Sequence, residues 1–273
     1  MFGGTSIHHI DMGGFDTSRV DNMRGMFINC RDLKTMDMRS LDTSRVKNMT
    51  EMFSGCESIT DINMEGLNTA KVKNMSGMFS RCENLKNLDI NGIDTSAVSN
   101  MSRMFEMCSE IENLDLSSFD TSHVTDMSYM FFGCGGFTSV DLSSFDTSNV
   151  VFMNGMFEQC RGLQTLNINN FNTDSVENMA SMFEKCRTIE TLDIRGFRTP
   201  SVVDFSNMFA SCENLKDLNI AGMNIKSAMD ARFMFYECIN LRTLYMNLTA
   251  NAAADTEGMF LRCPSKMEII NGD

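Results

Sequence analysis

The sequence lacks the features that mark several classes of protein. It contains no run of about 18 apolar residues, which is the length that a membrane-spanning helix needs. Its first residues, MFGGTSIHHIDMGG, hold no basic segment followed by an apolar one, so we expect no signal peptide in them. Lys and Arg number 23 against 36 Asp and Glu, and the net charge is −13. Nucleic acids and anionic membranes bind clustered Lys and Arg, so we expect neither as a partner.

Histidine is also scarce, which bears on catalysis. The three histidines are His8, His9 and His123, and no carboxylate or nucleophile recurs beside them. A catalytic triad or a metal centre needs such partners in a defined arrangement. The sequence therefore predicts that the protein is not an enzyme.

Cysteine, in contrast, recurs at a constant interval. Nine cysteines lie 26 residues apart, the tenth follows after 25, and a Met-Phe pair precedes each one. Self-similarity at this period is typical of stacked repeats. We expect residues 1–273 to form a single solenoid of about ten repeats, with half a repeat at 1–14 and a degenerate, capping repeat at about 247–273. Because the sequence begins in mid-repeat, we expect it to be part of a longer protein.

One repeat, residues 33–57, shows two apolar patterns. Leu33, Met36 and Met38 follow the L-x-x-L-x-L spacing of a leucine-rich repeat and predict a strand. After the turn residues L-D-T-S, apolar residues recur at steps of three, three, one and three, which predicts one face of a short helix. These residues are Val46, Met49, Met52, Phe53 and Cys56.

The expected fold is therefore an α/β repeat solenoid of the leucine-rich type. A parallel sheet of ten strands should line its concave face and short helices its convex face. Helices pack about 8–10 Å apart and strands about 4.8 Å apart, so the helical side should be the wider one. Where leucine-rich repeats usually stack asparagine, this sequence has an apolar residue, and a threonine column runs two residues on, from Thr17 to Thr199. We expect the threonine hydroxyls to bond the backbone of the turns.

The sulfur-containing residues match core positions. Zinc needs four ligands that converge as a tetrahedron, whereas the cysteines form a line. A disulfide needs Cα atoms about 4.4–6.8 Å apart, and rungs on a helical side should be further apart. We expect free, buried thiols, and we expect nearly all of the 27 methionines to fill the core.

The outward positions of the expected strands carry acidic and amide side chains. The Asp column, as we name it, consists of Asp11, Asp37, Asn63, Asp89, Asp115, Asp141, Asn167, Asp193, Asn219 and Tyr245. It has two interpretations: a structural, hydrogen-bonded ladder, or a surface that binds a ligand or a hard cation such as calcium. The candidate ligand-binding residues are Asp37, Asp61, Asp89, Asn113, Asp115, Asp141, Asn167 and Asp193.

The motif at residues 114–134, L-D-L-S-S-F-D-T-S-x-V-x-x-M-x-x-M-F-x-x-C, resembles the 26-residue repeat of BspA-like bacterial surface proteins and mycoplasma lipoproteins. The resemblance covers almost the whole chain. It implies a protein outside the cell, at the cell surface, and it supplies no catalytic residues.

Two functions are compatible with that resemblance. The first is adhesion, in which the concave face binds a host or matrix protein or another cell surface. The second is a structural spacer that holds another domain away from the cell wall. We expect a monomer that has no cofactor. Calcium is the one cation that we consider as a possible ligand.

Overall fold

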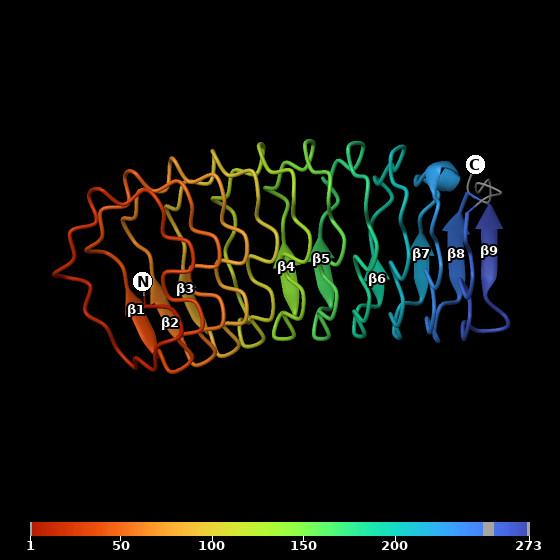
Figure 1. The fold of residues 1–273 in the computed structure, drawn as a ribbon. Helices are drawn as coiled ribbons and strands as arrows, with labels where there is room; N and C mark the ends of the chain where they lie inside the picture. The colour runs from red at the N-terminus through yellow and green to blue at the C-terminus, as the bar shows by residue number, and fades with distance from the viewer. Residues whose placement is uncertain (1, 248–253, 272–273) are drawn as a thin grey trace.

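The computed structural model describes residues 2–247 and 254–271. It is a stack of rungs, one per repeat, with the two ends of the chain at opposite ends of the stack (Figure 1). Within the described residues there are nine short strands and one 3-10 helix, η1. The elements are β1 (Thr35–Asp37), β2 (Asp61–Asn63), β3 (Asn87–Asp89), β4 (Ser139–Asp141), β5 (Thr165–Asn167), β6 (Thr191–Leu192), β7 (Asp217–Asn219), η1 (Ile225–Ser227), β8 (Thr243–Met246) and β9 (Glu268–Asn271).

The strands pair in parallel, as expected. Paired residues in β1 to β8 lie 26 positions apart, for example Met36 opposite Ile62 and Ile62 opposite Leu88. The pairing is interrupted, however, and gives three sheets: β1-β2-β3, β4-β5 and β6-β7-β8-β9. The expectation of one continuous ten-stranded sheet was therefore wrong.

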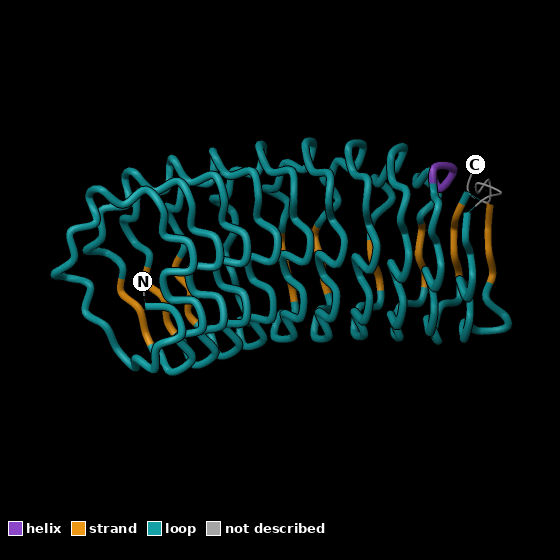
Figure 2. The backbone as a smooth tube through the Cα atoms, in the orientation of Figure 1, coloured by secondary structure: helices purple, strands orange, loops and turns teal. Residues whose placement is uncertain are grey.

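The expected helices on the other side were also wrong. We call this side the turn face; in one rung it comprises residues 46–56. Its five apolar side chains are fully buried, so the predicted inward face is confirmed. The backbone, however, is a series of turns, and Figure 2 shows almost the whole chain as loop.

Hydrogen bonds between rungs replace the helical ones on the turn face. The N–H groups of Met49, Glu51 and Phe53 donate to carbonyls of the next rung at 2.9–3.0 Å. The alternate N–H groups donate within the rung: Met52 donates to the Met49 carbonyl three residues back, and Thr50 donates to the side-chain oxygen of Asn48. A ladder of nine parallel bridges follows this face, from the pair Asn22 and Asn48 to the pair Asp230 and Asp255.

This alternation needs left-handed backbone at two positions of every rung. The first position is Glu51, the second Gly55, and their equivalents in all ten rungs have φ between 55° and 73°. Fourteen of these residues are not glycine. Left-handed backbone costs an L-residue about 1–2 kcal/mol, and the bonds between rungs offset that cost.

The same bonds remove the reason for expecting a wide convex side. Strand spacing is about 4.8 Å in a hydrogen-bonded ladder, and the turn face is now such a ladder. Neither side of the stack is spread by helix diameters. We therefore call the surface formed by the outward side chains of the strands the sheet face rather than the concave face.

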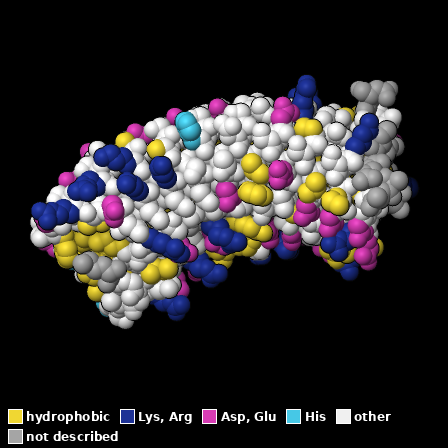
Figure 3. Space-filling view, turned by 45° about the horizontal axis from the view of Figure 1, so that its top comes forward, with side chains coloured by type: hydrophobic (Ala, Val, Ile, Leu, Met, Phe, Trp, Pro, Cys, Tyr) yellow, Lys and Arg dark blue, Asp and Glu magenta, His cyan; other side chains and the backbone are white. Residues whose placement is uncertain are grey.

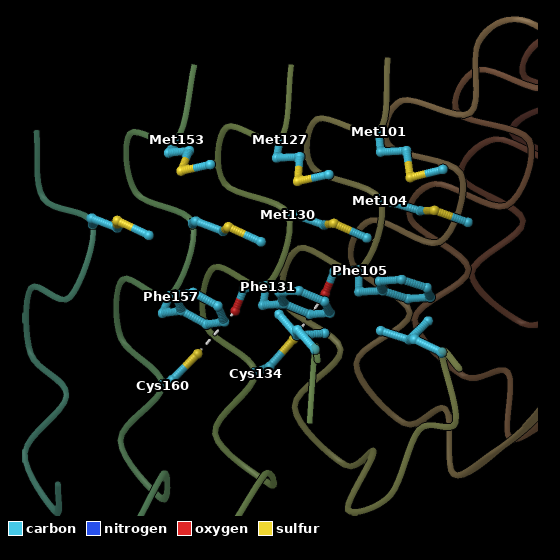
Figure 4. Close-up of a cluster of buried hydrophobic side chains, with 14 of the residues drawn as sticks. Met101, Met104, Phe105, Met127, Met130, Phe131, Cys134, Met153, Phe157 and Cys160 are labelled. Carbon is cyan, nitrogen blue, oxygen red and sulfur yellow. Dashed lines mark hydrogen bonds between the residues drawn. The ribbon is translucent and has the colours of Figure 1, made fainter. Parts of the chain in front are cut away.

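The core is built from columns of identical residues. Eleven phenylalanine rings, one per rung from Phe2 to Phe260, stack with centroids 5.3–6.0 Å apart and planes within 12° of parallel. Methionine columns lie beside the rings, as Figure 4 shows for Met101, Met127 and Met153. Most methionines are buried and Met229 is exposed, so core filling is confirmed for nearly all of the described ones.

All ten cysteines are free thiols, and nine are buried. Each thiol donates to the carbonyl of a phenylalanine one rung back, as Cys134 does to Phe105 at 3.0 Å (Figure 4). Burial raises the pKa of Cys56 to about 12. The prediction of unpaired thiols is correct, but its reason was not. The Cα atoms of cysteines in neighbouring rungs are about 4.8 Å apart, which is within the range for a disulfide. Their Cβ atoms, however, have the same spacing of about 4.8 Å, which exceeds the usual Cβ separation of about 3.8 Å in a disulfide.

The threonine column acts as expected. Its hydroxyls donate to a carbonyl 25 residues on, for example Thr121 to Asp146 at 2.9 Å. Thr43 is the exception, a buried hydroxyl without a hydrogen-bond partner among the described residues.

Both ends continue the repeat. Phe2 stacks on Phe27, so residues 2–14 hold part of a turn face as well as the strand half expected at 1–14. At the other end Phe260 stacks on Phe235, and β9 pairs with β8. The expected capping repeat lies partly outside the described residues, at 248–253 and 272–273; its strand β9 is exposed at every position.

A glycine substitution distinguishes turns from a helix. Gln159 has φ of 60° and occupies the column that holds Gly55 and Gly133. Gln159→Gly should raise the free energy of unfolding by about 1 kcal/mol, because glycine adopts left-handed backbone without a steric cost. In a helix the same change would lower it by about 1 kcal/mol. Urea denaturation measures the sign, and Glu158→Gly, at a neighbouring position with ordinary φ, should destabilise.

Candidate functional site

The Asp column has a structural role in every rung where it carries Asp or Asn. In all of these rungs but that of Asn167, the side-chain oxygen accepts the N–H two residues on and closes the turn after the strand. Asp89 accepts from Asn91 at 3.0 Å, Asp115 from Ser117 at 2.9 Å and Asp141 from Ser143 at 3.0 Å. Asparagine does the same at Asn63. Acidity is therefore not required for the turn.

Two candidate residues near the ends of the column form ion pairs. The guanidinium of Arg39 donates to both carboxylate oxygens of Asp37 and lowers its pKa to about 2. Arg195 does the same for Asp193, whose pKa is also about 2. These carboxylates lie on the sheet face, but their charge is already matched.

Two further candidates bond between rungs. Asn87 donates to Asp61 at 2.6 Å, and Asn167 donates to Asp141 at 2.9 Å. The amide of asparagine supplies an N–H donor to the neighbouring carboxylate. An aspartate at the same position could not, because an ionised carboxylate only accepts hydrogen bonds. Asp61 and Asn167 thus belong to the hydrogen-bonded ladder that the structural interpretation predicts.

The sheet opens where two aspartates of the column are neighbours. Asp115 lies between Asp89 and Asp141, and residues 113–115 form no strand although they are described. No backbone hydrogen bond joins residues 111–116 to β3 or β4 in the described structure. The rung of Asp11 likewise forms no strand and does not pair with β1, which holds Asp37.

Like charges explain the central opening at Asp115, but not the gap at Asp11, because Arg39 already matches the charge of Asp37. Hydrogen bonds from Ser117 and Ser143 lower the pKa of Asp115 and of Asp141, so both are ionised at neutral pH. Like charges directly opposite each other on adjacent strands are destabilising. Where asparagine separates two aspartates, as between Asp37 and Asp89, the strands pair. The gap between β5 and β6 has no such like-charge pair, and nothing in the structure explains it.

The opening exposes core residues and creates a groove. Leu88, Leu114, Val140 and Leu166 occupy the central strand position and are only partly buried, whereas Met36 and Leu218 are buried at the same position. A cavity of about 580 Å³ lies between β3 and the unpaired rung. Its lining residues are Lys86, Asn87, Leu88, Asp89, Asn91, Glu110, Glu112 and Asn113.

The eight candidate residues therefore divide into two groups. Asp89, Asn113, Asp115 and Asp141 surround the opened centre. Asp37, Asp61 and Asn167 lie in paired strands, and Asp193 directly follows the paired strand β6. The partly exposed leucines and the groove acids Glu110 and Glu112 were missed. Aspartate at three successive positions of the Asp column was the signal available in the sequence.

In the described part of the chain no three His, Cys, Asp or Glu residues are placed to hold a metal ion. Calcium therefore enters only as a variable in the binding test below.

The described residues include no helix long and apolar enough to cross a membrane. Solved structures similar to this chain include three leucine-rich repeat proteins. A protein from Bacteroides ovatus matches with a TM-score of 0.47 and 16% identity over 91% of this chain, which spans 58% of that protein. A leucine-rich cell-surface protein from Faecalibacterium prausnitzii matches with a TM-score of 0.43 and 18% identity. The match covers 91% of this chain and 75% of that protein. A leucine-rich repeat protein from Leptospira interrogans matches with a TM-score of 0.34 and 11% identity. The match covers 88% of this chain and 72% of that protein.

Sequence comparison is more specific. No curated protein matches the chain significantly. One family model matches three overlapping segments, residues 1–113, 81–191 and 162–271, and so covers nearly every repeat. The predicted resemblance to mycoplasma surface repeats is thereby confirmed, and the chain belongs to the family described as Mycoplasma protein of unknown function, DUF285.

Proposed function

We propose that this chain is the macromolecule-binding part of a bacterial cell-surface protein and that it binds through the sheet face. The observation that carries the proposal is the opened centre of that face. Three adjacent carboxylates surround partly exposed apolar side chains there. A surface with apolar contacts inside a charged rim is the usual composition of a protein interface.

The chemistry of the opened centre favours a basic protein surface as partner. Asp89, Asp115 and Asp141 are exposed and form no ion pair with a described residue. Lys or Arg side chains of a host or matrix protein would relieve the repulsion between these carboxylates. Adhesion to a host or matrix protein, or to another cell surface, is the function we infer from this arrangement.

A structural spacer is the second candidate, and a different observation favours it. Eight of the nine Asp and Asn residues of the column from residue 11 to residue 219 close a turn, and the ninth, Asn167, donates to Asp141, so the column is accounted for without any ligand. A spacer would bind nothing by itself and would tolerate loss of charge on the sheet face.

Asparagine at three positions separates the two functions. Asp89→Asn, Asp115→Asn and Asp141→Asn together keep the turn bonds and remove three charges. We expect binding to host cells and to purified matrix proteins to weaken about tenfold or more, since charge pairs at an interface dominate its electrostatics. Binding is measured at low and high salt, with and without a calcium chelator. Stability in urea should rise, because neighbouring strands lose their repulsion.

The matched control removes the same charge from the same rungs. Asp94, Asp120 and Asp146 close turns through the serines two residues on, at the edge beside the sheet face. Their replacement by asparagine should leave binding unchanged. Equal loss in both triple variants would assign binding to net charge rather than to the sheet face. A wild-type protein that binds none of the targets would support the spacer.

A further inference from the structure

The acidic chain carries a compact basic surface that the 26-residue period assembles. Turns of the first three rungs place cations in two columns at the edge between the sheet face and the turn face. We call this surface the basic stripe; it consists of Arg19, Arg45 and Lys71 in one column and Lys47 and Lys73 in the other. Figure 3 shows Lys and Arg side chains gathered over these N-terminal rungs, while the middle of the same view is largely uncharged.

Backbone hydrogen bonds fix the spacing of the stripe. The N–H of Lys73 donates to the carbonyl of Lys47 at 2.9 Å, and the bridges between Asn22, Asn48 and Asn74 hold all three rungs in register. Neighbouring cations of one column are therefore about 5 Å apart along the solenoid axis. The sequence gives no sign of this cluster locally, because members of a column are 26 residues apart.

The cations of the stripe are available to a partner. All five side chains are exposed, and none forms an ion pair with another described residue. The nearby acids are Asp16, Asp42 and Asp21. Asp16 and Asp42 accept hydrogen bonds from Ser18 and Ser44, and Asp21 stands at the N-terminal end of the lysine column. Held in line at one-rung spacing, the five cations form a local positive surface despite the net charge of −13.

The residues around the stripe narrow the class of partner. Residues 16–25, 42–51 and 68–77 contain no aromatic residue, so nothing there would stack on bases of a nucleic acid. Val46 and Val72 are fully buried, Val20 is partly buried, and the exposed Phe15 lies outside these three segments, so the stripe itself offers few apolar side chains that could insert into a membrane surface. What remains is a straight row of cations beside hydroxyl and amide groups.

We propose that the basic stripe binds a linear sulfated polysaccharide. Such a chain carries closely spaced anionic groups along one axis, and Arg and Lys bind sulfate oxygens through charge-assisted hydrogen bonds. Its sugar hydroxyls would lie against the polar turn residues. This surface is separate from the opened centre of the sheet face, so the two can be tested independently.

Residues borrowed from the fourth rung provide a variant that should fold. That rung has Ala97 and Ser99 at the positions of the two columns. Arg45→Ala, Lys47→Ser, Lys71→Ala and Lys73→Ser together remove four cations without new backbone demands. On immobilised heparin, wild type should be retained and elute with salt. The variant should bind heparin oligosaccharides at least about tenfold more weakly at physiological salt, since each cation near an anionic surface contributes about a factor of five.

Two further variants complete the test. Arg161→Ser, Arg187→Ser, Lys216→Thr and Arg242→Thr also remove four cations, again with residues that other rungs carry, and should leave heparin affinity unchanged. Ala97→Lys with Ser99→Lys lengthens both columns by one rung and should tighten binding. Retention of heparin by the four-site stripe variant would overturn the proposal, as would absence of heparin binding by wild type. Stronger stripe-dependent binding to single-stranded DNA or to anionic vesicles would overturn the choice of polysaccharide.

Discussion

Deletion of residues 119–144 is expected to leave a folded protein that is shorter by one rung. The cut joins Ser118 to Phe145 and restores the native sequence S-S-F-D-T-S at the junction. Every buried column continues across it, because each rung contacts chiefly its neighbours. The denaturant m-value should fall by about one tenth, in proportion to the surface that unfolding exposes. Circular dichroism melts and urea titration provide the measurement.

Deletion of residues 119–131 alone should have the opposite outcome. It would set half of one turn face against a strand, and polar side chains would enter the phenylalanine column. We expect loss of a single cooperative transition and exposure of apolar surface. Deletion of residues 145–170, the next full repeat, is the matched control and should behave like the first deletion. Equal tolerance of the full and half deletions would contradict the stacked architecture.

Phe131→Ala should be the most destabilising single substitution at the centre of the stack. Phe131 is fully buried, and its ring lies between Phe105 and Phe157 with centroids 5.7 and 5.6 Å away. Truncation of a buried phenylalanine costs about 3–5 kcal/mol, and here the cavity would interrupt the aromatic column between two halves of the solenoid. Urea denaturation measures the loss, and hydrogen exchange should show faster opening of the adjacent rungs first.

The neighbouring residue supplies the control. Phe132 is only partly buried and contacts Tyr129 edge-on at the turn-face surface. Phe132→Ala should cost about 1 kcal/mol or less, within the range of substitutions at partly exposed positions. Similar losses for both variants would argue that the column does not carry the stability we assign to it.

The sequence by itself determined the repeat, the buried columns and the state of the cysteines. Side-chain chemistry decides burial, and it recurs every 26 residues regardless of backbone conformation. Val46, Met49, Met52, Phe53 and Cys56 are all buried, as their spacing predicts. The same spacing could not decide between a helix and a series of turns, because both place these five side chains on one side.

Only the tertiary structure decided the backbone of the turn face. A helix of about ten residues is marginal by itself, since it forms bonds only within its own length. In the stack each rung meets carbonyls of the next rung along its whole length, and those bonds outweigh the cost of left-handed backbone at residues such as Gln159. These acceptors lie 25 residues away, beyond the reach of local pattern.

Tertiary structure likewise decided both candidate surfaces. The repeat places Asp89, Asp115 and Asp141 in one column, but only the structure shows that the sheet is open around them. Arg45 and Lys71 are equally distant in sequence and become neighbours through the bridges of the turn face. Electrostatic interactions depend on the distance between charges in space. The period of the sequence sets which charges become neighbours. The fold sets how close they lie and which of them remain exposed.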